Sequence, residues 1–242
     1  MKLFKYYSDS VNSFKSISVK GLWCHFPNKM NDPAECLHIL DREFTDEEIN
    51  LFKKYVAKSN DIDIKRIASF ENTQIVDFFN LQRKKFIEKF TFVSLSESFD
   101  DILMWSHYAS SHSGFVVEFD FDETFMKKHH FQKIHYTDNL PKLEITKIAE
   151  FMYGKDDDFD YFFEDVSKKL KVWENEKEWR VWRNKPCYFH YEGTDIKNVY
   201  FGINTTIETK ALVAKLVAES NKDVIFNFME FSKNPVKLTF RS

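Results

Sequence analysis

The spacing of apolar residues predicts which parts of the chain are helical. Thr45 and Glu48 have the spacing of a capping box, in which each side chain bonds the other residue's backbone N–H at a helix start. Apolar side chains follow at helical intervals: Ile49, Phe52, Val56, Ile75, Phe79, Phe86 and Phe90. The pattern predicts that residues 45–90 are mainly helix, with further helices over residues 142–171 and 206–220.

Alternating apolar residues and β-branched or aromatic side chains predict strands elsewhere. The predicted strands cover residues 3–7, 16–26, 91–99, 113–121, 132–138, 176–184, 187–193, 198–204, 223–231 and 236–240. We expect 132–138 to neighbour 113–121 and the last two strands to form a hairpin-like pair. This order of elements predicts one α+β domain over residues 1–242, in which helical insertions interrupt a mostly antiparallel sheet.

Charge changes this picture little. Lysine and arginine number 35 against 38 acidic residues, so the net charge of −3 gives no global positive field for nucleic acid or an anionic membrane. The start of the chain lacks the apolar core of a signal peptide, and no apolar stretch has the length of a membrane span. We therefore expect a cytoplasmic protein with no membrane partner.

Several common kinds of site lack their sequence markers. Cys24, Cys36 and Cys187 are odd in number and have no CxxC spacing, so we expect buried thiols, with no disulfide framework and no zinc site. The chain has no GxGxxG, Walker A, HExxH or GxSxG motif. Dinucleotide redox, P-loop and familiar hydrolase chemistry are therefore not indicated.

The stretch "KVWENEKEWRVW" contains a candidate site. On a strand, Glu176, Glu178 and Arg180 project from one face, because residues two apart share a face. Two neighbouring carboxylates repel, and an arginine offsets the repulsion and can hold one of them by a bidentate hydrogen bond. Such a group can stabilise a cationic transition state. The alternative is a solvated strand edge with an incidental salt bridge.

A second stretch, "FVSLSE", places Phe92, Ser94 and Ser96 on one face of an earlier strand. The two serines could simply bond local backbone groups. An aromatic residue with Ser-x-Ser on one strand, followed by Glu-x-Glu on a later one, is similar to the pattern of the ADP-ribosyltransferase fold. In that family an early strand adds a basic residue or histidine, and the middle strand reads aromatic-x-Ser-Thr-Ser. Leu95 stands here in place of the threonine, and "FKYYS" offers Lys5 or Tyr7 for the early strand.

The closest resemblance is carried by "DDILMWSHYASSHSGFVVEFD", together with "FKYYS", "LWCHFPNKMNDPAE", "FVSLSES" and "WENEKEWR". These segments resemble the bacterial family catalogued as Domain of Unknown Function 2971. The first segment predicts a short helix and turn in which Trp105, Tyr108 and His112 lie near helical spacing, and Gly114 lets the backbone reverse. Its aromatic rings form either a lid packed on the core or a wall for a flat ring such as nicotinamide or adenine.

The resemblance to the transferase fold implies a split-sheet domain and a mono-ADP-ribosyltransferase that uses NAD. Glu178 would stabilise the oxocarbenium-like ribose and bind its 2′-hydroxyl, while Glu176 would orient or deprotonate the acceptor. Ser94 and Ser96 would support Glu178 and the nicotinamide ribose. Lys5 or Tyr7 would contact the diphosphate or adenosine side.

Family habit also implies the biological setting and the partners. An enzyme of this type without an export signal suggests an intracellular toxin of a bacterial defence or toxin–antitoxin system, held in check by an antitoxin protein. The acceptor would be a macromolecule, either protein or nucleic acid.

Two alternatives of other classes stay open. A non-catalytic module could bind a nucleotide or a partner in the same aromatic pocket, with Glu176, Glu178 and Arg180 as an internal ion network. A nuclease-like hydrolase could hold a metal ion between Glu176, Glu178 and Glu118. Divalent-metal dependence would distinguish this hydrolase from the transferase.

Overall fold

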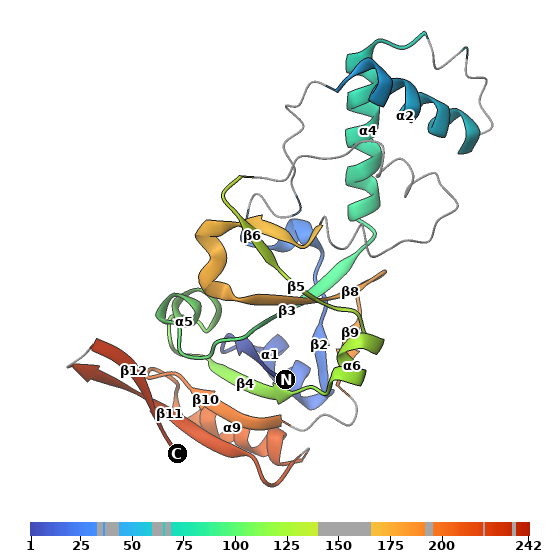
Figure 1. The fold of residues 1–242 in the computed structure, drawn as a ribbon. Coiled ribbons are helices and arrows are strands. Elements are labelled where there is room, and N and C mark those ends of the chain that lie inside the picture. Colours follow the sequence, from blue (N-terminus) through green and yellow to red (C-terminus); the bar gives the residue numbers. More distant parts are fainter. Residues whose placement is uncertain are drawn as a thin grey trace. The chain divides into compact units, whose positions relative to one another are not determined.

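A computed structural model shows the fold (Figure 1). It describes residues 1–32, 36, 44–59, 65, 69–139, 166–191, 196–219, 221–233 and 236–242. The chain divides into two compact units: the first comprises Met1–His25, Thr91–Ile134 and Val172–Ser242, and the second comprises Phe26–Phe90 and His135–Lys171. The expectation of one domain stays a prediction.

The first unit contains a large, mostly antiparallel sheet. Its eight strands run in the order β12-β11-β10-β4-β1-β3-β8-β5, and the pairing of β10 with β11 is parallel. The strands are β1 (Lys2–Tyr7), β3 (Thr91–Ser96), β4 (Phe115–Asp120), β5 (Phe131–Lys133), β8 (Glu178–Arg183), β10 (Ile196–Phe201), β11 (Ile225–Lys233) and β12 (Val236–Arg241). The antiparallel pair β11–β12 confirms the predicted hairpin. The mixed fold with a large antiparallel sheet is likewise confirmed.

The middle of this sheet joins the three strands on which the sequence placed candidate residues. β1 lies between β4 and β3, and β8 lies beyond β3. β1 pairs with β4 along its whole length, whereas it pairs with β3 at Phe4 and Ser96. β3 and β8 are in continuous register, with Ser94 opposite Arg180 and Ser96 opposite Glu178.

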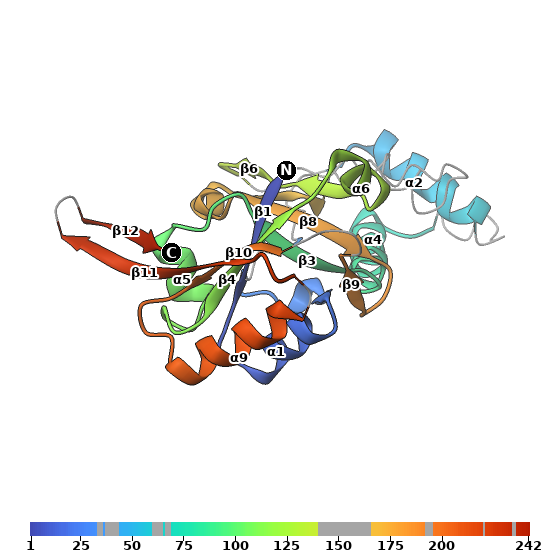
Figure 2. The same ribbon diagram turned by 90° about the horizontal axis from the view of Figure 1, so that it is seen from below.

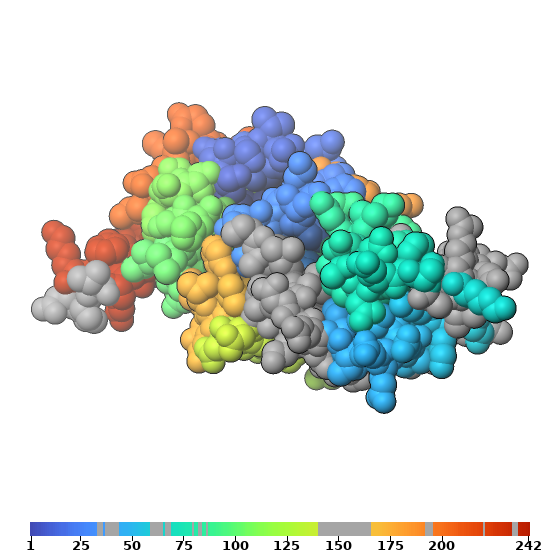
Figure 3. All heavy atoms as spheres, turned by 90° about the horizontal axis from the view of Figure 1, so that it is seen from above, coloured from blue at the N-terminus to red at the C-terminus, as the bar shows by residue number. Residues whose placement is uncertain are grey.

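Helices and a small sheet complete the first unit. They are α1 (Val11–Ser18), α5 (Ile102–Tyr108), α6 (Glu123–Lys128), α9 (Ile207–Ala218), most of the 3-10 helix η2 (Lys171–Glu176), and the paired strands β2 (Gly21–Trp23) and β9 (Tyr188–His190). α1 and α9 pack side by side (Figures 2 and 3). The predicted strand over residues 16–26 was wrong in its first part, because Ser10 caps α1 by accepting from the Ser13 N–H, and α1 continues to Ser18.

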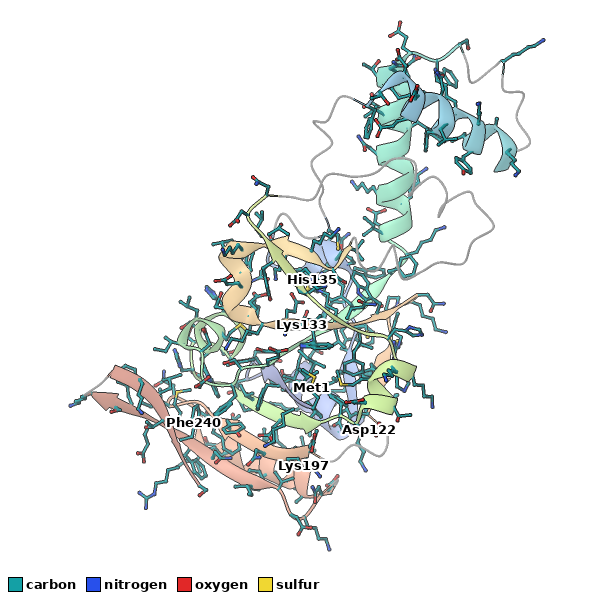
Figure 4. The ribbon with its side chains drawn as sticks, viewed as in Figure 1. Met1, Asp122, Lys133, His135, Lys197 and Phe240 are labelled. Atoms are coloured by element: carbon teal, nitrogen blue, oxygen red, sulfur yellow. The ribbon has the colours of Figure 1, made fainter. Side chains whose placement is uncertain are left out.

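Two aromatic-rich clusters hold the first unit together. One includes Leu3, Tyr7, Val93, Leu95, Phe115, Val117, Phe119 and Val181, with α1 and α9 contributing Ile17, Val213 and Val217. The other includes Phe4, Tyr6, Trp105, Val116 and Tyr200. Phe240 of β12 packs on this second cluster, with its ring 5.2 Å from that of Phe99 (Figure 4). Alternation along β1 therefore assigns successive residues to different clusters.

The second unit contains the predicted helical block. Its elements are η1 (Pro27–Lys29), α2 (Asp46–Ser59), α4 (Asn72–Ile87) and the parallel pair β6 (His135–Thr137) and β7 (Lys168–Leu170). The capping box is present, since Thr45 N–H donates to Glu48 Oε2 at 2.9 Å and Glu48 N–H donates to Thr45 Oγ1 at 3.2 Å. Residues 168–170 form a strand instead of helix, and most of the helix predicted over 142–171 lies outside the described residues.

The neighbour predicted for residues 113–121 was wrong. β4 pairs with β1 and β10, whereas the segment 132–138 is divided into β5, which pairs with β8, and β6, which pairs with β7. Alternation indicates that a segment is extended, but it contains no information about which strand lies beside it. Among the helices of the described residues, none has the length and apolar character needed to cross a membrane.

The turn before β4 depends on a glycine for close approach. Ser110, Ser111 and His112 make the reversal with positive φ angles of 48°, 51° and 67°, and a Cβ at Gly114 would lie 2.0 Å from the Tyr7 carbonyl oxygen. We expect Gly114→Ala to lower the free energy of unfolding by about 3 kcal/mol, because backbone must move to make room. Urea titration measures this, with Ser113→Ala as the control. An unchanged midpoint in Gly114→Ala would contradict the prediction.

Candidate functional site

Glu178 is held by two side chains from neighbouring strands. Ser94 Oγ donates to Glu178 Oε1 at 2.6 Å, from β3 to β8. Arg180 Nε donates to the same oxygen at 2.7 Å, and Arg180 Nη2 donates to Oε2 at 3.0 Å. This bidentate geometry fixes the carboxylate plane. The structure thus brings together three of the residues that the sequence singled out.

The ion pair between Glu178 and Arg180 is buried. The Arg180 side chain is 0% exposed and that of Glu178 is 5% exposed. The Arg180 guanidinium also lies over the Phe92 ring, 4.2 Å from its centroid. Removing one member of such a pair leaves the other charge buried without its counter-ion, which is strongly unfavourable. The pair is therefore a rigid part of the sheet, and the predicted solvated strand edge is wrong.

Glu176 does not continue the strand. It is the last residue of η2, and Lys177 follows with a positive φ of 44°, so β8 begins only at Glu178. The expectation that Glu176 projects as a third strand residue is therefore wrong, because this backbone turn breaks the alternation. Its carboxylate Oε1 instead accepts from the Tyr108 hydroxyl of α5 at 2.5 Å.

The Ser96 side chain binds the backbone of the same segment. Its hydroxyl donates to the carbonyl oxygen of Glu176 at 2.7 Å and accepts from the Ser98 N–H at 3.0 Å. Ser94 and Ser96 thus have different roles: the first binds the carboxylate of Glu178, and the second fixes the turn that enters β8.

Lys5 of β1 contacts the backbone of Ser94. Its ammonium donates to the Ser94 carbonyl oxygen at 2.9 Å. Burial lowers the pKa of Lys5 to about 8, and the negative charge of Glu178 offsets part of that shift. The β1 lysine is therefore electrostatically coupled to the β8 carboxylate.

A pocket with a volume of about 580 Å³ opens beside Lys5. Its walls come from β1, α1, β2, α5 and β9: Lys5, Tyr6, Tyr7, Ser8, Ser10, Asn12, Ser13, Lys15, Ser16, Trp23, His25, Tyr108 and Tyr188. The lining contains two lysines, several hydroxyl groups and aromatic rings, and it includes no aspartate or glutamate among the described residues. Such a lining suits a planar ligand that carries negative charge.

Sequence reasoning missed most of this wall. Trp23, with its ring 5.0 Å from that of Tyr188, comes from β2, and Lys15 of α1 lies over the Tyr188 ring at 5.9 Å. Partial burial and the charge of Lys5 lower the pKa of His25. The Ser10–Ser13 spacing could have indicated that a helix begins there, but it does not indicate that α1 contributes to a site.

The other candidates lie in the core or away from the pocket. Tyr7 is buried against Phe115, with ring centroids 5.1 Å apart, and also lines the pocket. Trp105 is fully buried, its indole N–H donates to the Phe99 carbonyl oxygen at 2.6 Å, and it is not part of the pocket lining. His112 stacks on Trp105 and contacts Ser106 Oγ at 3.1 Å. The predicted aromatic wall thus reduces to Tyr108, and Trp105 packs as part of the core.

The three carboxylates proposed for a metal site bind separate partners. Glu118 on β4 forms an ion pair with Lys2 at 2.8 Å and accepts from Tyr200 at 2.8 Å. Glu176 accepts from Tyr108, and Glu178 is paired with Arg180. Within the described part of the chain, no group of three or more His, Cys, Asp or Glu residues is arranged to hold a metal ion. The geometry therefore does not favour the metal-dependent hydrolase.

Comparison with known protein families gives a match from within α5 to within β8. Residues 104–181 match the family described as "Protein of unknown function (DUF2971)". The predicted resemblance to DUF2971 is thereby confirmed for that region, which includes Tyr108, Glu176, Glu178 and Arg180. No curated protein and no solved structure matches the chain.

The lowered pKa of Lys5 predicts a pH-dependent stability. An unfolded chain keeps this proton up to about pH 10.4, whereas the folded protein releases it near pH 8. Between these values the unfolded state binds more protons, so the free energy of unfolding rises with pH, by on the order of 2 kcal/mol for this group. Lys5→Met should remove that rise. Urea titrations of both proteins at the two ends of this pH window measure it, and equal rises would contradict the assignment.

Proposed function

We propose that this protein is a mono-ADP-ribosyltransferase that cleaves NAD and transfers ADP-ribose to a macromolecule. The observation that carries the proposal is the convergence of Lys5, Ser94 and Glu178 from three adjacent strands, together with the place of Lys5 in the pocket lining. A basic residue, a serine and a glutamate occur in this strand order in the transferase fold. Assignment of the sheet to that fold is part of the same proposal.

The chemistry requires a fixed negative charge near the ribose. Departure of neutral nicotinamide breaks the glycosidic bond and leaves positive charge on the ribose, which an adjacent carboxylate stabilises. Glu178 supplies that carboxylate, and Ser94 and Arg180 hold it in one orientation before substrate arrives. Preorganisation of this kind avoids rearrangement of the charge during the reaction.

The pocket provides groups for the rest of NAD. Lys5, which carries a proton at neutral pH, and Lys15 are positioned for the diphosphate, and the serine hydroxyls can bind phosphate or ribose oxygens. Trp23 and Tyr188 offer ring faces for a base. The cavity volume of about 580 Å³ lies in the range of pockets that bind small molecules.

Glu176 is the group for the acceptor. Its carboxylate accepts from the Tyr108 hydroxyl, and Tyr108 lines the pocket, so Tyr108 connects the proposed NAD site to the carboxylate of Glu176. The acceptor is a protein or a nucleic acid. In a cell that makes it, such an activity acts as a toxin of a defence or toxin–antitoxin system that an antitoxin protein restrains.

A second candidate is a non-catalytic module that binds a nucleotide or a partner. The burial and bidentate pairing of Glu178 with Arg180 favour it, because they are also the properties of a structural ion pair. In that case the pocket binds its ligand without breaking a bond.

Transfer of label from adenylate-labelled NAD in a bacterial lysate distinguishes the two candidates. Wild type is compared with Glu178→Gln, and products are treated separately with protease and nuclease. Glu97→Gln serves as the matched control for Glu178→Gln because Glu97 accepts from Lys133 at 2.7 Å outside the pocket lining. Label that appears with wild type and Glu97→Gln, is absent with Glu178→Gln, and disappears with one treatment supports the transferase and identifies the acceptor class. Intact NAD and no label would overturn it and favour the binding module.

A further inference from the structure

Two cysteines lie opposite each other in the small sheet of the first unit. The register of β2 and β9 places Leu22 opposite Phe189 and Trp23 opposite Tyr188, so the next pair is Cys24 and Cys187. The Cys24 N–H donates to the Cys187 carbonyl oxygen at 3.0 Å. Both cysteines are reduced thiols.

Their backbone positions suit a cross-strand bond. Directly opposite residues of an antiparallel pair point to the same side, and a hydrogen-bonded pair has its Cα atoms about 5.5 Å apart, within the range found for disulfides. The Cys187 side chain is close enough to Cys24 to raise the pKa of the Cys24 thiol. Cβ atoms of such pairs are usually about 1 Å farther apart than in a relaxed disulfide. A bond here would therefore be strained, and strained disulfides are readily reduced.

The two thiols differ in accessibility. Cys24 is fully buried, whereas Cys187 is partly exposed. Burial and the neighbouring Cys187 raise the pKa of Cys24 to about 12. The Arg183 guanidinium is close enough to both thiols to interact with them electrostatically. An oxidant from solution thus reaches Cys187 first, and Cys24 is the second thiol.

We propose that Cys24 and Cys187 are a modification site, a dithiol that hydrogen peroxide oxidises to a reversible intramolecular disulfide. The Cys187 sulfur attacks the peroxide O–O bond, giving a sulfenic acid and one water. The Cys24 sulfur then attacks the Cys187 sulfur, forms the S–S bond and releases the second water with the Cys24 proton. The two thiols lose two electrons and two protons, and the peroxide is reduced to two waters. A dithiol reductant reverses the change.

The bond would act on one wall of the pocket. Trp23 and Tyr188 are the residues next to the two cysteines, and their rings meet edge to face at a centroid distance of 5.0 Å. A disulfide would fix the separation of β2 and β9 at that point. This site stands on the cysteine geometry and is independent of the proposed transferase.

Treatment of the full-length protein with hydrogen peroxide, followed by peptide mapping by mass spectrometry, tests the proposal. We expect a linked peptide that contains Cys24 and Cys187, lighter by two hydrogens than the two thiols, and its loss after dithiothreitol. Cys36→Ser, which removes the third thiol, should give the same linked peptide.

Single variants test the order of the steps. Cys24→Ser should convert Cys187 to sulfinic acid, because no second thiol intercepts the sulfenic acid, and Cys187→Ser should leave Cys24 a thiol. Wild-type protein that shows no linked peptide, whether its thiols stay reduced or Cys187 is oxidised to sulfinic acid, would overturn the proposal.

Discussion

Glu178→Gln is expected to lower the rate of ADP-ribosyl transfer by about a thousandfold, which corresponds to about 4 kcal/mol of transition-state stabilisation. Glutamine keeps the shape of the side chain and can still accept from Ser94 and Arg180. It lacks the negative charge that, in the proposed reaction, would stabilise the ribose as nicotinamide leaves. Rates are measured with saturating labelled NAD and compared with those of Glu97→Gln, because the Glu97 carboxylate binds Trp179 Nε1 at 2.8 Å instead of Arg180 or Ser94.

A loss of folded protein must be distinguished from a loss of chemistry in that comparison. Arg180 would keep its charge in a buried place with a neutral partner, so Glu178→Gln should also be less stable by about 1–3 kcal/mol. Circular dichroism and the unfolding midpoint identify a temperature at which both proteins are folded. NAD binding by calorimetry should change little at that temperature. Transfer equal to wild type in folded Glu178→Gln would remove Glu178 from the reaction.

Arg180→Met is expected to lower the free energy of unfolding by about 3–5 kcal/mol at neutral pH. Methionine fills much of the same space over Phe92, but Glu178 would be left buried without its bidentate partner. The loss should shrink as the pH falls, because protonation of Glu178 removes the buried charge. Urea titrations at neutral and at acidic pH measure both effects.

The double variant Glu178→Met with Arg180→Met is the control for that result. It removes both charges and keeps apolar volume, and a buried ion pair replaced in this way is often no less stable than the original. We expect it to recover most of the stability lost in Arg180→Met. A double variant as unstable as Arg180→Met would show that the loss comes from packing around Phe92 and Trp182 instead of from an unpaired charge.

The sequence predicted those parts of the site that depend on a repeating pattern. Alternation along residues 91–96 and 178–183 correctly gave Ser94, Glu178 and Arg180 a common face, since one long register joins these strands. Glu176 does not share this face, because Lys177, with its positive φ, ends the strand alternation. A local backbone reversal of this kind has no periodicity to reveal it.

The pocket could not be predicted for a different reason. Lys15, Trp23 and Tyr188 come from α1, β2 and β9, and none belongs to a motif. They line one cavity because β2 pairs with β9, although the two strands are far apart in the sequence. Trp105 is the opposite case, a residue within a recognised sequence pattern that does not line the pocket. It lies in the segment that matches a protein family, yet its ring is fully buried and packs with Tyr6.

The order of β1, β3 and β8 in the chain also affects when the site can exist during synthesis. Lys5 is made near the start, Ser94 in the first half and Glu178 in the last third, and the chain makes α2, α4 and β6–β7 between them. Closing these long intervals is slow compared with forming local helices. No nascent chain that ends before β8 contains the carboxylate, so a ribosome-bound fragment is inactive toward NAD if the proposed chemistry holds. The activity would arise only after translation has passed Arg183 and β8 has joined β3.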